Sequence, residues 1–342
     1  MEPILEIKDL SIDFKVKRGV LRACDNVSMT IYRGDIVGII GESGSGKSTL
    51  ASGILKTIKA PGRISEGEII YHTPAGEQID LLKLTESEYA KYRWSNITTV
   101  FQAAQNVLNP SLKIKEHFLE TAWAHDCELN DKEILEKAAK LLKDVRLEER
   151  VLDSYPHQLS GGMKQRTIIA LSLLLEPDVL ILDEPTTALD VITQWYIIDI
   201  LKKIHEERNI TMIFMTHDVS IIGSIVDRLA VMYAGQLVEY GKVKDVFFHP
   251  THPYTYGLMH AIPSLHDDVS KRFAIPGFPP NMLEIEPICR FKPRCSLAIK
   301  GYCEGIKEKT DAMYEGRPQQ LSRCYMWDQV EELYEIKKVN EV

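Results

Sequence analysis

The sequence predicts an α/β fold, because short apolar runs typical of buried strands alternate with segments that have the 3.6-residue periodicity of amphipathic helices. Residues 179–182 and 212–215 are entirely apolar, as expected for strands of a sheet that is covered on both faces. The stretch between them carries apolar residues at helical spacing. A mostly helical insertion is expected at about 103–172.

The flanking segments fit the same pattern. Apolar and polar residues alternate from Leu10 to Val16, which predicts a half-buried strand, and residues 35–40 predict a short buried strand. A helix is expected over residues 47–58. Within the insertion, residues 130–147 begin with an Asn-x-x-Glu capping box and carry one apolar stripe, which predicts another helix.

The composition changes near residue 249. Nine of the 16 prolines and four of the six cysteines follow that point. Because proline lacks a backbone donor and ends helices and strands, this last segment is expected to be rich in loops. The predicted domains are therefore residues 1–248 and an accessory domain at residues 249–342, which is called the tail below.

Charge and composition exclude several classes of protein. Lys and Arg total 41 against 49 Asp and Glu, a formal net charge of −8, so a broad basic face for nucleic acid is not expected. The strongest apolar stretch, residues 171–182, is interrupted by charged residues and a proline, and a membrane span needs ~20 apolar residues. The acidic N-terminus does not resemble a signal peptide. Six cysteines in 342 residues do not indicate a secreted disulfide scaffold, which predicts a cytosolic protein with reduced thiols.

Residues 41–48 have the sequence GESGSGKS, which fits the pattern G-x-x-x-x-G-K-[ST] between a predicted strand and a predicted helix. The backbone N–H groups of such a loop wrap the α- and β-phosphates of a nucleotide. Its lysine reaches the β- and γ-phosphates, and its last hydroxyl binds Mg²⁺. We therefore predict binding of ATP or GTP with Mg²⁺, through Gly41, Ser43, Gly44, Ser45, Gly46, Lys47, Ser48 and Thr49.

Two acidic residues, Asp183 and Glu184, end the predicted strand at 179–182. In phosphoryl-transfer sites a carboxylate at this position holds Mg²⁺, a role we assign to Asp183. The adjacent Glu184 is expected to orient or deprotonate the attacking water. An acid pair that accompanies a phosphate loop is better explained by catalysis than by a solvated loop.

A second surface with affinity for phosphate is predicted at residues 159–166, with the sequence LSGGMKQR. Its small residues precede a helical run at 167–175, so their N–H groups meet the N-terminus of a helix. Two such surfaces in one chain are explained if they approach one nucleotide from opposite sides.

Taken in order, these motifs closely resemble those of the ATP-binding-cassette (ABC) family over residues 4–245. The motifs are the phosphate loop, Gln102 after TTVF, LSGGM at 159–163, ILDEP at 181–185, ALD at 188–190 and His217. The resemblance implies a P-loop ATPase cassette with a RecA-like core, an antiparallel β subdomain and a helical subdomain.

The family also implies how these residues act. Two cassettes pair head to tail, and each ATP lies between the phosphate loop of one subunit and the LSGGM of the other. Gln102 would contact Mg²⁺ or the attacking water and sense the membrane subunits. His217 would contact the γ-phosphate, and Asp190 would shape the dimer seam. The residues that would serve the partner's nucleotide are Ser160, Gly161 and Gly162.

Phe14 has two interpretations. It lies where the family places an aromatic residue that stacks on adenine, an interaction worth ~1–3 kcal/mol per base. It also continues the apolar face of the strand from Leu10 to Val16. Stacking and core packing are both compatible with the sequence.

The start of the tail narrows the resemblance to the cassettes of peptide importers, a group that includes oligopeptide, dipeptide and nickel transporters. Residues 249–255 read HPTHPYT, and Leu258 and the sequence AIP at 261–263 follow. The sequence LNP at 108–110 also matches this group. The preceding AAQNV at 103–107 departs from its usual Asp-Pro-rich stretch, at the expected permease contact.

The resemblance implies an ATP-hydrolysing subunit on the cytoplasmic side of the cell membrane that powers import of dipeptides or oligopeptides. The implied partners are a second ATPase subunit (identical in isolation, related in the working complex), two transmembrane permeases and an external binding protein. The alternatives are the same machinery with nickel or oligosaccharide cargo, and a non-transport ATPase that acts on ribosomes or DNA. The acidic balance and the single cassette disfavour the last.

Four cysteines of the tail have the spacing C-x5-C-x7-C-x20-C: Cys289, Cys295, Cys303 and Cys324. Small loop-rich units commonly need a metal or disulfide, and a cytosolic location disfavours disulfides. The C-x2–4-C hairpin typical of structural zinc is absent, whereas wider loops can hold an iron–sulfur cluster. We predict a structural [4Fe-4S] cluster, with zinc and free or paired thiols as the alternatives. Arg290, Lys292 and Arg294 are expected to offset its negative charge.

Overall fold

The computed structural model describes residues 1–102, 107–187, 189–261, 275–285, 288–304, 313–315 and 318–334. The chain forms two compact units. The first unit comprises Met1–Glu2, Tyr32–Ile36 and Lys83–Thr216, and the second comprises Pro3–Ile31, Val37–Leu82 and His217–Val342. In the described part of the chain, no helix is long and apolar enough to cross a membrane.

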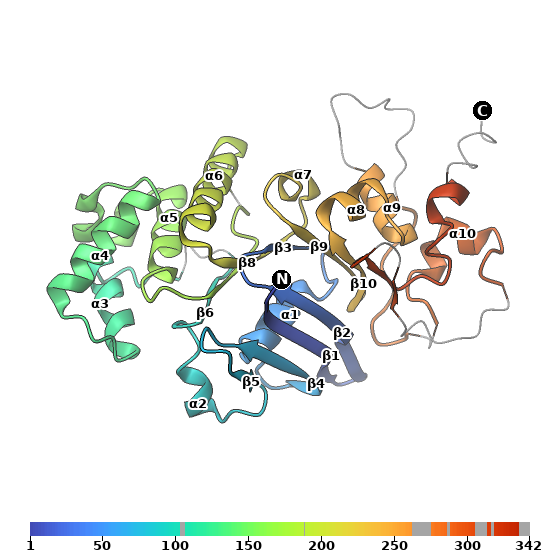
Figure 1. Ribbon diagram of the computed structural model, residues 1–342, viewed down its shortest axis with the longest axis horizontal. Coiled ribbons are helices and arrows are strands. Elements are labelled where there is room, and N and C mark those ends of the chain that lie inside the picture. The colour runs from blue at the N-terminus through green and yellow to red at the C-terminus, as the bar shows by residue number, and fades with distance from the viewer. Residues whose placement is uncertain are drawn as a thin grey trace. The chain divides into compact units, whose positions relative to one another are not determined.

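An antiparallel sheet opens the second unit, as the family resemblance predicts. Its strands lie in the order β2-β1-β4-β5 (Figure 1). They are β1 (Pro3–Val16), β2 (Gly19–Tyr32), β4 (Gly62–His72) and β5 (Gln78–Asp80). The predicted strand at 10–16 is confirmed, but it begins earlier. Buried apolar residues start at Ile4, and the pairing of β1 with β4 extends back to Leu5, which lies opposite Tyr71.

The helix that follows the phosphate loop, α1 (Lys47–Ile54), packs against β1. A Cβ added at Gly53 would lie 2.7 Å from the Cδ1 atom of Ile12, so a glycine permits this close approach. The prediction of a helix to residue 58 is wrong. The chain turns out of the helix at Lys56, whose φ of 52° is left-handed, a common way for a helix to end.

The second sheet of this unit has the strand order β11-β12-β10-β9-β3. Strand β3 (Ile36–Ile40) is fully buried, as predicted for residues 35–40, and pairs in parallel with β9. The tail adds the two-residue strands β12 and β11 to β10 in antiparallel pairing. These strands are β9 (Arg228–Tyr233), β10 (Gln236–Lys242), β11 (Tyr314–Glu315) and β12 (Leu321–Ser322).

The other helices described in the same unit are short. They are α7 (Val219–Ile222), α8 (Val243–Phe248), α9 (Pro253–His260), the 3₁₀ turn η5 (Lys292–Arg294) and α10 (Ser296–Ile299). With so little regular secondary structure, the described part of the tail is attached to the rest of the unit partly by polar side chains. The buried carboxylate of Glu239 in β10 accepts hydrogen bonds from the backbone N–H and hydroxyl of Thr251, both at 2.8 Å, and from the side-chain amide of Gln320 at 2.9 Å.

The first unit contains a parallel sheet with the order β8-β7-β6. Its strands are β6 (Ile97–Val100), β7 (Val179–Asp183) and β8 (Thr211–Thr216), and every residue in them is buried. The predictions of strands at 179–182 and 212–215 are confirmed. The helix predicted between them is α6 (Val191–Arg208).

Helices dominate the remainder of the first unit, in agreement with the predicted insertion (Figure 1). Helices α3, α4 and α5 pack against one another. The capping box of α4 is present, since Asn130 Oδ1 accepts from the Glu133 N–H at 3.1 Å and Glu133 Oε2 accepts from the Asn130 N–H at 2.9 Å. The elements are α2 (Glu86–Ala90), α3 (Ile114–Ala124), α4 (Asp131–Asp144), η2 (Glu149–Asp153), η3 (Pro156–Gln158) and α5 (Gly161–Ser172).

Candidate functional site

The phosphate loop, residues 41–48, joins β3 to α1 in a conformation that requires glycine. At Gly41 an added Cβ would lie 2.1 Å from the carbonyl oxygen of Met232, and at Gly46, whose φ is 104°, it would lie 2.6 Å from that of Ala23. Gly46 is also the N-cap residue of α1, and the first turn of this helix contains no acidic residue. The loop therefore leads into a helix N-terminus suited to an anion.

Lys47 lies at the centre of this loop and is buried. Its Nζ donates to the carbonyl oxygen of Gly41 at 2.7 Å and to that of Glu42 at 3.2 Å. The Oγ atom of Ser45 accepts from the same Nζ at 3.5 Å. The loop thus folds around its own cation, as a cradle for phosphate requires.

In the first unit, the acidic end of β7 forms a polar cluster with Gln102. The Gln102 Nε2 donates to Glu184 Oε2 at 2.8 Å, and the hydroxyl of Thr187 donates to the same oxygen at 2.9 Å. Glu184 has a φ of 48°, an uncommon conformation for a residue with a side chain, and its N–H donates to the carbonyl oxygen of Met215. Asp183, the last residue of β7, is buried. The structure therefore brings Gln102 and Glu184 together; sequence reasoning did not identify Thr187, which lies between two recognised motifs.

The LSGGM segment begins α5, and its serine is the helix cap. Ser160 Oγ accepts from the N–H of Met163 at 3.3 Å. An added Cβ at Gly162 would lie 2.9 Å from the Cγ2 atom of Thr193 in α6. Asp190 caps α6 by accepting from the N–H and the hydroxyl of Thr193, at 2.9 and 2.7 Å. Two helix N-termini of the first unit therefore meet, with Gly161 and Gly162 in the first turn of α5.

Asp190 is exposed, and its hydrogen bonds from the hydroxyl and then the backbone N–H of Thr193 lower the pKa of its carboxyl group. It therefore stays ionised at neutral pH. An ionised carboxylate at the N-terminus of α6 interacts favourably with the helix dipole and stabilises the helix.

The remaining predicted nucleotide residues lie in the second unit. His217 directly follows β8 and is exposed. Phe14 in β1 is half-buried, and its ring lies against the backbone of Gly62. Its stacking on adenine stays a prediction. Ala188 and residues 103–106 and 262–263, which belong to recognised motifs, lie outside the described residues.

All four predicted cysteines of the tail line one cavity of about 50 Å³, together with apolar side chains that include Ile288, Phe291 and Leu297. We call it the cysteine cavity. Burial raises the pKa of each of the four thiols, to about 11 for Cys295, so in this environment they hold their protons at neutral pH. Within the described residues, no group of three or more His, Cys, Asp and Glu side chains is arranged to hold a metal ion.

Arg290 and Arg294, which were expected to offset the charge of a cluster, instead bond to carboxylates of the cassette. Arg290 binds the carboxylate of Asp25 and a backbone carbonyl, and Arg294 binds the carboxylate of Glu42. Carboxylates accept charge-assisted hydrogen bonds from guanidinium more strongly than neutral thiols do. Lys292 does act on the cavity, where its charge opposes the burial effect on the pKa of Cys289 and Cys303.

The phosphate loop, the acidic end of β7 and the capped LSGGM helix define a nucleotide-binding cassette of the P-loop ATPase class. Residues 24–187 match the family described as "ABC transporter". Residues 238–303 match the family described as "Oligopeptide/dipeptide transporter, C-terminal region".

Curated relatives match over most of the chain. The sequence is 46% identical over 310 residues to the dipeptide transport ATP-binding protein DppD of Caldanaerobacter subterraneus subsp. tengcongensis, which covers 90% of this chain and 93% of that protein. It is 39% identical over 328 residues to the oligopeptide transport ATP-binding protein OppD of Haemophilus influenzae, with coverage of 95% and 98%. The chain therefore belongs to the ATP-binding proteins of the ABC transporter family, in the dipeptide and oligopeptide group.

A solved structure has the same cassette fold. The dimeric bacterial ABC transporter cassette MJ0796 superimposes with a TM-score of 0.62 at 32% identity, covering 70% of this chain and 99% of that one. The same cassette has been solved as a dimer in a post-hydrolysis state bound to ADP and Pi, with a TM-score of 0.61 to this chain. The expected fold class is confirmed.

Proposed function

We propose that this chain is the ATP-hydrolysing subunit of an ABC importer for dipeptides and oligopeptides. The similarity to DppD and OppD over nine-tenths or more of the chain carries the proposal, because it includes the tail as well as the cassette. The phosphate loop and the Gln102–Glu184 pair support ATP hydrolysis in particular.

In this proposal each predicted residue has a chemical role in the reaction of ATP and water to ADP and phosphate. Lys47 and the amides of the phosphate loop, with Ser43, Gly44, Ser45 and Thr49, bind the phosphates. Ser48 and Asp183 provide hydroxyl and carboxylate oxygens, the ligands that Mg²⁺ prefers. When bound, Mg²⁺ neutralises charge that develops on the phosphate oxygens.

The remaining roles concern the water and the partner cassette. Glu184 orients the attacking water and accepts its proton, and Gln102 and Thr187 hold the Glu184 carboxylate in place through their hydrogen bonds. His217 contacts the γ-phosphate, and Phe14 supports the adenine. Ser160, Gly161 and Gly162 face the nucleotide of the partner cassette, with Asp190 at the seam.

The proposed assembly contains a second cassette, two transmembrane permeases and an external binding protein, with this chain on the cytoplasmic face of the membrane. Fractionation of cells tests this arrangement. The chain should sediment with washed membranes and be released when the permeases are deleted. Sedimentation with ribosomes instead would support a non-transport ATPase.

We also propose that the cysteine cavity holds a structural [4Fe-4S] cluster. Its support is that all four thiols line one largely apolar cavity, and that thiolates are the ligands of such clusters.

Protein purified without oxygen should therefore be brown, absorb broadly near ~400 nm and contain about four irons per chain. A Cys295→Ser variant should lose the colour and most of the iron, because it lacks one thiolate. Cys127→Ser removes a cysteine outside the cavity and should keep both. Colourless wild-type protein with one zinc or no metal would contradict the cluster.

A further inference from the structure

The tail holds the second residue of the phosphate loop, Glu42, through a forked ion pair. Arg294 Nη1 donates to Glu42 Oε2 at 2.9 Å, and Arg294 Nη2 donates to Glu42 Oε1 at 3.0 Å. The Arg294 side chain is only 7% exposed and that of Glu42 is 28% exposed. Two parallel hydrogen bonds at a partly buried site fix both the distance and the orientation of the carboxylate. The sequence separation of 252 residues makes this a tertiary contact rather than a local turn.

A second tail residue holds the backbone of Glu42. The Glu42 N–H donates to the hydroxyl oxygen of Tyr254, in α9, at 3.0 Å. The ring of Tyr254 packs against Tyr233 and Phe291, with centroids 4.6 and 5.5 Å away. Arg294 joins this group, because its guanidinium lies 5.6 Å from the centre of the Tyr233 ring and donates to its hydroxyl. Glu42 is therefore held by side chain and backbone against a buried aromatic cluster.

The position of Glu42 also affects the lysine that binds phosphate. Lys47 Nζ donates to the carbonyl oxygens of Gly41 and Glu42, so a shift of Glu42 moves both acceptors of the ammonium group. A loop that samples other conformations must be reordered before it can bind a nucleotide. The apparent affinity then falls by the fraction of molecules that have the competent loop.

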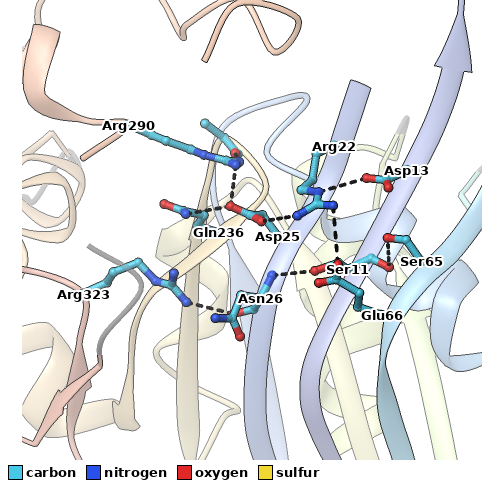
Figure 2. Close-up of polar contacts among 11 residues, drawn as sticks. Ser11, Asp13, Arg22, Asp25, Asn26, Ser65, Glu66, Gln236, Arg290 and Arg323 are labelled. Atoms are coloured by element: carbon cyan, nitrogen blue, oxygen red, sulfur yellow. Dashed lines mark hydrogen bonds and ion pairs between the residues drawn. The ribbon is translucent and has the colours of Figure 1, made fainter. Parts of the chain in front are cut away.

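The segment that carries Arg294 is itself anchored on the second unit, so it forms a fixed support. Three of the four cysteines that line the cysteine cavity have an arginine as their direct neighbour in the sequence. These arginines are Arg290, Arg294 and Arg323. Figure 2 shows two of them: Arg290 contacts Asp25, and Arg323 donates to the carbonyl oxygen of Asn26 at 2.8 Å. Each arginine thus ties the chain around the cavity to the strands and loops of the cassette.

We propose that Arg294 is a positioning residue for nucleotide binding, which acts through Glu42 to keep the phosphate loop in its competent conformation. The affinity of the cassette for ATP then depends on the tail, through the hydrogen bonds of Arg294 to Glu42. The expected change in ATP binding and hydrolysis rests on the proposed ATPase function. The expected ordering of the phosphate loop by Arg294 does not.

The test compares Arg294→Gln, Glu42→Gln and the double variant in the full chain. Lys292→Gln is the matched control, since it removes a cation two residues away whose charge acts on the cysteines instead. The first readout is hydrogen exchange at the amides of residues 41–48 without nucleotide. The second is the Kd for Mg·ATP, together with kcat and KM for its hydrolysis.

Arg294→Gln should accelerate exchange in the loop and weaken Mg·ATP binding about tenfold, the size expected for loss of hydrogen bonds to a charged group. KM should rise with kcat nearly unchanged. The double variant should be no weaker than the more affected single variant, because both remove one interaction. Glu42→Gln tests the same contact from the loop if Arg294→Gln does not fold.

Wild-type exchange and affinity in Arg294→Gln, an equal effect of Lys292→Gln, or fully additive single effects would overturn the proposal. Failure of the wild-type chain to bind ATP would instead refute the proposed function. Loop exchange would still decide the role of Arg294 in that case, since it is measured without nucleotide.

Discussion

Replacement of Glu184 with glutamine should slow ATP hydrolysis at least ~100-fold while Mg·ATP still binds, as expected for loss of a general base. Glutamine keeps the shape of the side chain and an oxygen that can accept from Gln102 and Thr187, so the local structure should persist. What is lost is the carboxylate that accepts the proton of the attacking water. The variant should accumulate as an ATP-bound dimer, measured by size-exclusion chromatography with Mg·ATP.

The control for this variant is Glu176→Gln, which removes a carboxylate of the same unit that pairs with Lys137 at 2.8 Å on the surface. Steady-state hydrolysis by this control should match that of the wild type, because exposed ion pairs contribute little. Near-normal turnover by Glu184→Gln would remove Glu184 from its proposed role.

Ser160→Arg should abolish ATP hydrolysis and leave ATP binding intact, because Ser160 is proposed to serve the nucleotide of the partner cassette. Ser160 caps α5, and loss of this cap costs helix stability by about 1 kcal/mol, so thermal melting must confirm that the variant is folded. Arginine at this position places a long cation where a small residue is expected to approach the γ-phosphate.

Mixing Ser160→Arg with Lys47→Ala tests the action between subunits, provided the chain forms homodimers. Each variant alone has two defective composite sites, whereas a mixed dimer contains one intact site. An equal mixture should therefore regain about a quarter of the wild-type sites, since half of the dimers are mixed. Full activity of Ser160→Arg alone would contradict the shared-site arrangement, and so would a mixture that regains nothing despite forming mixed dimers.

The parts of this protein that the sequence predicts well are those determined by local chemistry. The phosphate loop is recognisable because glycine is needed where a Cβ would strike a carbonyl, as at Gly41. The buried strands β7 and β8 are recognisable because a sheet covered on both faces requires unbroken apolar runs. The sequence singles out Gln102 and Glu184 separately, and the hydrogen bond between them is a finding of the structure.

The contacts that the sequence did not predict join residues far apart in the chain. Glu239 gathers Thr251 and Gln320 around a buried carboxylate, and no spacing in the sequence signals such a partner. The position of Arg294 next to Cys295 predicts a counter-charge for a cluster, yet its side chain bonds to Glu42. The sequence predicts too long a helix α1 for a different reason, because the apolar spacing continues to Ile58, beyond the turn at Lys56.

Uptake of labelled peptide into vesicles that hold this chain and ATP on their inner side tests the central claim most directly. Proteoliposomes or native vesicles that contain the permeases and the binding protein should accumulate a labelled dipeptide or oligopeptide when wild-type chain and Mg·ATP are present. Vesicles with Glu184→Gln should accumulate none. Uptake that proceeds equally without this chain, or ATP hydrolysis by the wild type that drives uptake of none of the peptides, would contradict its assignment as the ATPase of a peptide importer.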